Sequence, residues 1–193
     1  PAVTAALGDP LAGLNRGLAA NYQANGDGYK KLLANSASIE TPAEALHEAF
    51  QWAVGSIEQL RARTLTTNET ALVAGYHASG DSARPGFGWY FGRDALWTLF
   101  AVNSYGDFQL TRDELNFLVR RQSHEGKIIH EWAQTADLVD WKSLPYEFAS
   151  SDATPLFLMA MNDYLEVSGD VAFVKENWPA IARAWSFETS HDS

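Results

Sequence analysis

The chain of 193 residues contains no cysteine and few basic residues. Without thiols, disulfide bonds, thiolate nucleophiles and thiolate metal sites are excluded, but the compartment stays open because many exported proteins also lack disulfides. Fourteen Lys and Arg against 24 Asp and Glu give a formal net charge of −10, which repels phosphate backbones and anionic membrane surfaces. No apolar run reaches the roughly eighteen residues that span a bilayer. We therefore expect a soluble chain that has neither nucleic acid nor a membrane as its partner.

The chain is rich in apolar and aromatic residues. A hydrophobic content of 46% with only 20% charged residues excludes a disordered acidic chain, and the length suits one domain or one piece of a larger one. Aromatic residues make up 12% of the sequence, with seven Trp, seven Tyr and ten Phe. Such rings mostly fill cores, but they also line pockets for ring-shaped ligands. Many of them lie in long polar segments here, which favours the second use.

Capping signals predict two amphipathic helices. Thr41 before a proline, with Glu44 three residues later, indicates a helix start, and apolar residues then recur at helical spacing as far as residue 60. Thr111 with Glu114 is a second capping box, followed by a short amphipathic helix with a basic C-terminal end. Both helices should have one face in water.

A further amphipathic stripe covers residues 171–188, with Pro179 as its weak point. Two other segments are apolar on nearly every side: a helix from about Arg93 to Tyr105, and a helix at 156–165 that Asp152 can cap. These two helices must be covered all round, so we predict that they lie inside the molecule.

Amphipathic and fully apolar helices thus alternate along the chain, and period-two runs typical of strands are scarce. This order predicts an all-α fold of helical hairpins, with an outer solvated layer and an inner enclosed layer, as in a two-layer toroid. A four-helix bundle fits less well because it needs four similar amphipathic helices. Residues 1–40 form an N-terminal arm or linker, with a helix near 11–22 and a break at Gly26-Asp27-Gly28.

The connections that enter the two apolar helices are long, at about 64–92 and 123–151, whereas those that leave them are short. Long loops without repetitive composition are usually functional when they are not disordered. Both loops should arrive at the same end of the inner layer. Their residues are therefore expected to converge on one mouth.

The first loop ends with glycines and aromatics around Trp89 and then an Arg93-Asp94 pair at the start of an apolar helix. Asp94 could be a plain helix cap, with Arg93 its surface partner. Neither charge is easily hidden at the entrance to an enclosed layer, however, and a carboxylate held there suits the hydroxyls of a sugar. The segment is not a phosphate loop, because no strand, third glycine or Lys-Ser/Thr accompanies it.

The second loop interleaves carboxylates with aromatic rings, which fits a carbohydrate pocket because sugar rings offer apolar faces to aromatics and hydroxyls to acids. Its candidate residues are His130, Glu131, Tyr146 and Asp152, near Trp132, Trp141 and Glu147. His130 and Glu131 could instead only pin the loop. Zinc is disfavoured because the two histidines of the loop lie six residues apart, which misses helical His-Glu-x-x-His spacing. No cofactor is expected.

Three segments together resemble a known family: Gly-Trp-Tyr-Phe-Gly-Arg-Asp at 88–94, Gly-Lys-Ile-Ile-His-Glu at 126–131 and Ser-Ser-Asp-Ala-Thr-Pro-Leu-Phe at 150–157. They are similar to the opening part of the catalytic domain of amylo-α-1,6-glucosidase-like, glycogen-debranching-type glycosidases of the six-hairpin α/α-barrel class. The resemblance covers 41–193 and implies an (α/α)6 toroid of twelve helices, of which this chain supplies about five. It also implies a sugar subsite formed by Trp89, Arg93, Asp94, His130, Glu131, Tyr146 and Asp152.

The resemblance implies an inverting hydrolase of α-glucosidic linkages whose general acid and base both lie outside these 193 residues. We therefore expect the chain to be a fragment, inactive alone, that needs the remainder of its barrel or another copy of itself to cover its apolar helices. Trehalase-like and mannosyl-oligosaccharide-glucosidase-like hydrolases remain alternatives, as does a glycan-binding module without activity. Terpenoid cyclases rank last, because Asp137-Leu138-Val139-Asp140 is too sparse for an aspartate-rich magnesium motif.

Overall fold

The computed structural model describes residues 2–76 and 87–190, with side chains from Gly17 onward. The chain divides into two compact units, Pro1–Ser36 and Ala37–Ser193. The first unit is a single helix, α1 (Ala2–Asn35). The break predicted at Gly26-Asp27-Gly28 is wrong, since the helix continues through it. Gln23 Nε2 donates to both carboxylate oxygens of Asp27 at 3.1 Å, one helical turn apart, and such pairs support helical backbone across glycines.

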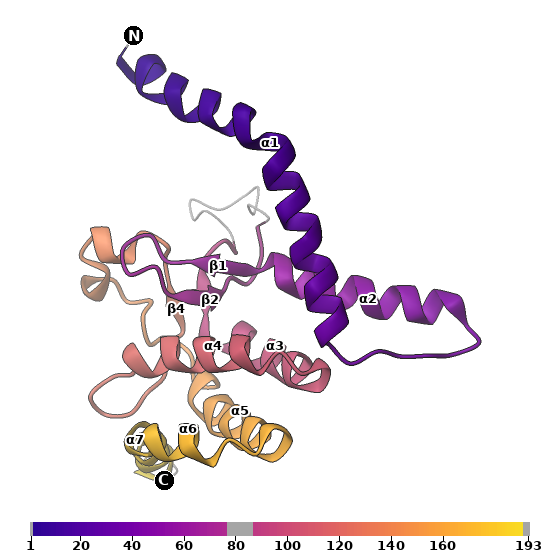
Figure 1. The fold of residues 1–193 in the computed structure, drawn as a ribbon. Coiled ribbons are helices and arrows are strands. Elements are labelled where there is room, and N and C mark those ends of the chain that lie inside the picture. Colours follow the sequence, from indigo (N-terminus) through magenta and orange to yellow (C-terminus); the bar gives the residue numbers. More distant parts are fainter. Residues whose placement is uncertain (1, 77–86, 191–193) are drawn as a thin grey trace. The chain divides into compact units, whose positions relative to one another are not determined.

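Helices also make up most of the second unit, so the prediction of a mainly helical chain is confirmed. In the described residues they are α2 (Glu44–Gln59), α3 (Gly92–Tyr105), α4 (Phe108–Arg120), α5 (Ala153–Ser168), α6 (Val171–Glu176) and α7 (Trp178–Ser190). Two 3₁₀ turns, Ala136–Leu138 and Trp141–Ser143, lie in the second long loop. Figure 1 shows α3, α4 and α5 side by side, with α6 and α7 following α5 at the C-terminal end.

In the described parts of the two long loops and beside them lie four short strands, where the sequence predicted none. β1 (Arg61–Arg63) pairs antiparallel with β2 (Thr70–Leu72), and β3 (Tyr90–Phe91) pairs antiparallel with β4 (Glu131–Trp132). A bridge between Val73 and Tyr90 joins the two sheets. The first loop therefore folds back on itself: Ala74 N donates to Trp89 O at 3.0 Å, and Gly75 N donates to Phe87 O at 2.9 Å.

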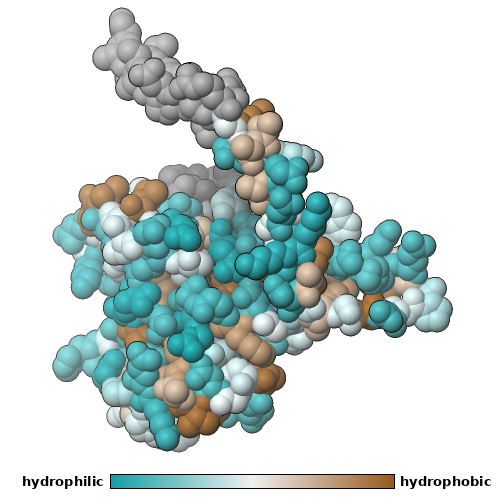
Figure 2. Space-filling view, viewed as in Figure 1, coloured by the Kyte–Doolittle hydropathy of each residue, from teal (hydrophilic) through white to brown (hydrophobic). Residues whose placement is uncertain are grey.

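The core lies between α3, α4, α5 and the strands. α3 packs against α5 and α4, and α4 packs against β2; the largest fully buried side chains include Tyr90, Leu96, Leu99, Phe117, Phe157, Tyr164 and Phe173. Within the described residues the two apolar helices are not enclosed on every side, because Trp97 of α3 is 59% exposed and Met159 of α5 is 53% exposed. These are sides that the sequence expects the remainder of a barrel or another copy of the chain to cover. Figure 2 shows apolar residues scattered among hydrophilic ones on the visible face of the molecule. Val167 of α5 and Val171 of α6 are about half exposed.

Two predicted helix starts need correction. α2 begins at Glu44, and the hydroxyl of Thr41 accepts from Ala43 N instead of capping the helix. α4 begins at Phe108, because Asp107 is its N-cap and accepts from Leu110 N at 3.1 Å. Thr111 and Glu114 are consequently buried in the middle of that helix. The sequence contained a better cap one turn earlier, and a capping-box spacing alone cannot distinguish the two.

The predicted helix at 171–188 is divided in two. α6 ends at Glu176, Asn177 forms the connection, and α7 begins at Trp178 with Pro179 as its second residue. Proline has no N–H to continue a helical ladder, but it is accepted in a first turn. The weak point identified from the sequence is thus the point where the helix divides.

Candidate functional site

The two long loops meet through backbone hydrogen bonds. In the β3–β4 pair, Tyr90 lies opposite Trp132 and Phe91 lies opposite Glu131. The pairing continues past the strands, since Gly92 N donates to His130 O at 3.0 Å. The start of α3 is therefore fastened directly to the His130-Glu131 segment, and the predicted convergence of the two loops is confirmed for their described residues.

Gly92 is the residue that permits this close approach. A Cβ atom at this position would lie 2.2 Å from Ile129 O and 3.3 Å from the Cβ of Ala153. Real Cβ atoms do not come so near a backbone oxygen, so any side chain here would push the loop away. Gly92 thus brings the beginnings of α3 and α5 and the second loop together.

Arg93 links two carboxylates at this junction. Its Nη1 lies 3.3 Å from Asp152 Oδ2, and its Nε lies 3.7 Å from Asp94 Oδ2. All three side chains are partly exposed. Partial burial alone would raise the pKa of Asp152, but hydrogen bonding from Ser150 and the charge of Arg93 outweigh it, so the pKa lies below its ordinary value. Asp152 is therefore ionised at neutral pH.

Neither aspartate caps its helix through its side chain. Phe91 occupies the N-cap position of α3, and Asp94 lies in the first turn, where a negative charge suits the helix dipole. Asp152 is the N-cap residue of α5, yet its side chain accepts no capping hydrogen bond. The predicted cap at Asp152 is therefore correct in position and wrong in its contact, because the carboxylate turns to Arg93 instead.

His130 and Glu131 lie beside this cluster. Glu131 is fully buried. His130 N donates to Glu147 O at 2.6 Å, and the His130 ring stands edge-on to Phe91 with 5.7 Å between centroids. Among the described residues, His130 Nδ1 and Asp94 Oδ2 are buried atoms without a hydrogen-bond partner. Buried polar atoms normally have hydrogen-bond partners, so these two atoms are exceptions at the junction.

The aromatic candidates meet around one tryptophan that was not among the seven predicted site residues. Trp141 contacts Trp89 edge-on at 5.3 Å, Tyr146 at 6.3 Å and Trp132 at 6.5 Å between centroids. Its Nε1 donates to Glu131 O at 3.3 Å. Trp141 is buried, whereas Trp89 and Tyr146 are partly exposed, so Trp141 supports the cluster and the other two can offer ring surface to a ligand.

Gln134, which the sequence analysis did not single out, also holds the two loops together. Gln134 Nε2 donates to Gly88 O at 2.6 Å, which ties the second loop to the first next to Trp89. Nothing in the local sequence distinguishes this glutamine, because its partner is a backbone carbonyl 46 positions away. All seven predicted residues are thereby carried by two segments that are linked at several points.

The described part of the chain contains no group of three or more His, Asp or Glu side chains that could hold a metal ion. No helix in the same residues has the length and apolar character needed to cross a membrane. No protein-family model matches the chain, and no curated protein is significantly similar to it. At the junction the structure brings together an ionised Asp152, two buried polar atoms without hydrogen-bond partners among the described residues, and two partly exposed rings.

Proposed function

We propose that the junction binds one sugar unit, and that the protein is a glycoside hydrolase acting on α-glucosidic linkages. The binding residues are Trp89, Arg93, Asp94, His130, Glu131, Tyr146 and Asp152. The observation that carries the proposal is the fastening of Gly92 to His130, since it places the Arg93-Asp94 pair beside His130-Glu131. Two loops that are about forty residues apart in sequence thereby supply complementary groups to one place.

The chemistry of these groups matches a sugar better than a flat apolar ligand. Sugar hydroxyls both donate and accept, so they can satisfy Asp94 Oδ2 as an acceptor and His130 Nδ1 in either tautomer. The charge of Arg93 helps to keep the pKa of Asp152 below its ordinary value, so this carboxylate is an acceptor for sugar hydroxyls. Partly exposed Trp89 and Tyr146 offer ring surface to the apolar face of a pyranose.

The same electrostatics argue for binding at this junction and against proton donation. A general acid in glycoside cleavage needs a raised pKa so that it carries a proton at neutral pH, whereas the pKa of Asp152 is lowered. In the proposed mechanism this subsite orients a glucose unit. A general acid and a general base about 6.5 to 9.5 Å apart, supplied by residues outside this chain, would cleave the bond with inversion.

The proposed fold is a partial (α/α)6 toroid, with α3 and α5 in its inner layer. It is supported by the direct packing of these two apolar helices and by the way both begin at the junction. The exposed Trp97 and Met159 would be covered by the rest of the barrel or by another copy of the chain. Trehalase-like and mannosyl-oligosaccharide-glucosidase-like hydrolases remain alternatives within this fold.

A glycan-binding module without activity is the second candidate function. The ion pair of Arg93 with Asp152 favours it, because the lowered pKa of Asp152 leaves an ionised acceptor that holds a sugar without transferring a proton. Product release separates the two functions. A hydrolase liberates glucose from maltose-type, isomaltose-type, branched-dextrin or trehalose substrates when the complete catalytic domain is assayed, whereas a binding module liberates none.

Binding itself can be tested on this chain. Titration with maltose, isomaltose and trehalose, followed by tryptophan fluorescence and calorimetry, should give saturable binding of at least one sugar. Asp94→Asn should weaken it about ten-fold, since it replaces a charged acceptor. Asp113→Asn on α4 is the matched control, because it removes the same charge where Gln109 is the partner. Equal effects of the two substitutions, or no binding of any sugar, would contradict the proposed site.

A further inference from the structure

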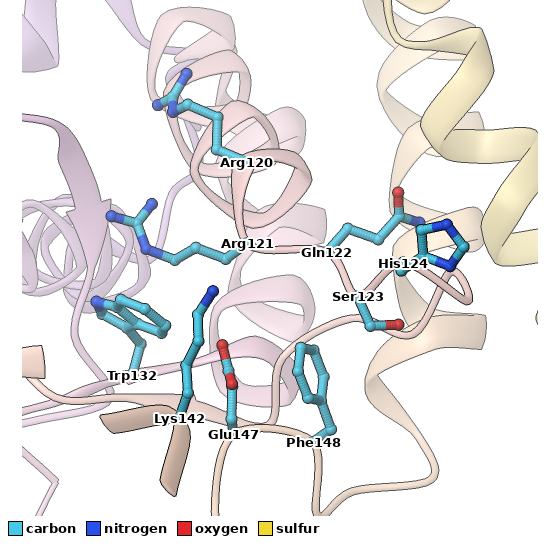
Figure 3. A pocket seen from close by; sticks show the side chains of 9 residues that line it. All are labelled: Arg120, Arg121, Gln122, Ser123, His124, Trp132, Lys142, Glu147 and Phe148. Atoms are coloured by element: carbon cyan, nitrogen blue, oxygen red, sulfur yellow. The ribbon is translucent and has the colours of Figure 1, made fainter. Parts of the chain in front are cut away.

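A pocket of about 300 Å³ lies between the end of α4 and the second loop. Figure 3 shows the backbone after α4 on one side, with Arg121 and Gln122, and the second loop on the other, from which Lys142, Glu147 and Phe148 extend. Its lining is Arg120, Arg121, Gln122, Ser123, His124, Trp132, Lys142, Glu147 and Phe148. Most of these side chains carry hydrogen-bond donors, which is the first indication of its ligand.

This pocket is separate from the proposed sugar subsite. Successive residues of a strand point to opposite faces, so Trp132, which lines the pocket, and Glu131, which belongs to the sugar subsite, lie on opposite faces of β4. None of the seven proposed sugar-binding residues lines the pocket. The inference below therefore does not rest on the proposed function.

Positive charge is in excess at the pocket, although the whole chain is acidic. Arg120 and Arg121 both pair with Glu69, with Arg121 Nη2 2.6 Å from Glu69 Oε2, so two cations share one carboxylate. Lys142 forms no ion pair within 4.0 Å in the described part of the chain. Glu147 is the one carboxylate in the lining; partial burial raises its pKa, and Lys142 opposes this only in part. Three cations thus face two carboxylates.

Arg121 is the best indication of an absent ligand. Its side chain is only 8% exposed, and its Nε has no hydrogen-bond partner among the residues described. The guanidinium is held in place, because its central carbon lies 3.7 Å from the Phe117 ring centroid and 5.0 Å from that of Trp132. A buried arginine with an unused donor is costly unless an acceptor completes it.

The turn that forms the pocket wall is rigidly built. Gly126 has φ 110°, and a Cβ there would lie 2.1 Å from Arg183 O of α7. Gln122 Nε2 donates to Gly126 O and Ala180 O, both at 2.9 Å. The Ser123 hydroxyl oxygen accepts from Lys127 N at 2.8 Å. This wall of the pocket is thus fixed before any ligand arrives, which lowers the entropy cost of binding.

We propose that this pocket binds the phosphate group of a small molecule. Arg121 and Lys142 are the donors, since guanidinium and ammonium groups form strong charge-assisted hydrogen bonds to phosphate oxygens. The volume leaves room for a compact polar body beyond the phosphate, and Trp132 and Phe148 provide apolar walls. Free phosphate and a sugar phosphate are the two sources that share this chemistry.

The test is calorimetric titration of the 193-residue chain with inorganic phosphate, glucose 6-phosphate, glucose and sodium chloride. Saturable binding of a phosphate-bearing ligand is expected. Lys142→Gln should weaken it by about five-fold or more, and Glu147→Gln should tighten it several-fold, because the first removes an attraction and the second a repulsion. Lys175→Gln on α6 and Glu166→Gln on α5 carry the same charge changes outside the pocket and should leave binding unaltered.

Each result of these titrations either supports or overturns the proposed phosphate site. Tighter binding of glucose 6-phosphate than of inorganic phosphate identifies a phosphate ester as the ligand, and equal binding identifies free phosphate; both support the site. Lack of saturable binding of both inorganic phosphate and glucose 6-phosphate, at ligand concentrations up to about 10 mM and in about 10-fold molar excess over the chain, overturns the proposal. So does an equal response to the pocket variants and their controls. Loss of glucose 6-phosphate binding in Asp94→Asn alone would assign that ligand to the sugar subsite instead.

Discussion

Glu114 should make the stability of this chain fall as the pH rises through neutrality. It is fully buried in the middle of α4, and its Oε2 accepts from Leu72 N of β2 at 2.6 Å. Its Oε1 is a buried oxygen without a partner in the described residues. Burial raises the pKa of Glu114 from 4.5 to about 8, and the Leu72 hydrogen bond and the Arg121 charge oppose this only in part.

The sign and size of the effect follow from proton linkage. Because the folded-state pKa exceeds the unfolded value, the folded chain holds an extra proton between pH 4.5 and about 8. Its contribution to stability is complete below pH 4.5 and is lost as the pH rises through about 8. A difference of this size corresponds to about 4 to 5 kcal/mol, of which about 3 kcal/mol is lost by pH 7.

Glu114→Gln isolates this contribution. Glutamine keeps an acceptor for Leu72 N but carries no charge, so the variant should gain stability relative to the parent chain with each step in pH from 5 to 9. Urea unfolding followed by tryptophan fluorescence at several pH values measures the difference. Glu166→Gln on α5, whose carboxylate accepts from Asn162, controls for the general relief of negative charge.

A constant difference between Glu114→Gln and the parent chain across this pH range would refute the reasoning, because a carboxyl group that titrates near its ordinary pKa loses its proton before the range begins. A difference that Glu166→Gln reproduces would assign the effect to net charge. Since Leu72 precedes Val73, which bridges to Tyr90, the result also reports on the sheet that leads to the proposed sugar subsite.

Three further perturbations test other parts of the structure. Gly92→Ala should lower the free energy of unfolding by about 2 kcal/mol or more and loosen the junction, because the new methyl group would lie 2.2 Å from Ile129 O. Gly88→Ala is the matched control in urea unfolding, since its methyl group would lie 3.7 Å from Gly75 O. Equal losses of stability in the two variants would contradict the role of Gly92. The pKa of Glu69 is lowered to about 2, because hydrogen bonds from Arg121 and Thr67 and the charges of Arg120 and Arg121 outweigh the effect of its burial. Glu69 therefore stabilises the chain above pH 4.5, and this contribution is lost as the pH falls through about 2. Acid unfolding of Glu69→Gln should lack this pH dependence. Trp97→Arg should reduce self-association of the chain in sedimentation measurements if the exposed apolar side chain of α3 seeks a partner, and a parent chain that is monomeric at all concentrations would contradict that expectation.

The sequence predicted the helices better than it predicted their ends. The apolar run that forms α3 was placed within one residue of its observed limits, because the long apolar run leaves no alternative to a helix. The capping box at Thr111 was wrong because its spacing is identical in a helix interior. Thr111 Oγ1 instead hydrogen-bonds to Asn103 Oδ1 at 2.7 Å, a contact with α3 that local sequence does not contain.

The short strands could not be predicted for a similar reason. β3 and β4 have two residues each, too few for any period-two pattern, and they exist because the two loops pair with one another. The convergence of those loops was predictable from the order of long and short connections alone. The order of connections could not show how the loops converge. Their convergence depends on the absence of a side chain at Gly92 and on the buried ring of Trp141.

Gly92 and Trp141 explain how the junction keeps its structure although its charged side chains are partly exposed. Gly92 lets the backbone of α3 approach the second loop, and Trp141 fills the space behind Trp89, Tyr146 and Glu131. Neither needs a ligand, so the scaffold is complete while Asp94 Oδ2 and His130 Nδ1 remain without hydrogen-bond partners in the described part of the chain. A preorganised binding site requires a scaffold whose own contacts are complete, together with polar atoms that still lack hydrogen-bond partners. Replacement of Trp141 should therefore weaken sugar binding without any contact to the sugar, whereas replacement of Trp89 should weaken it with the fold intact.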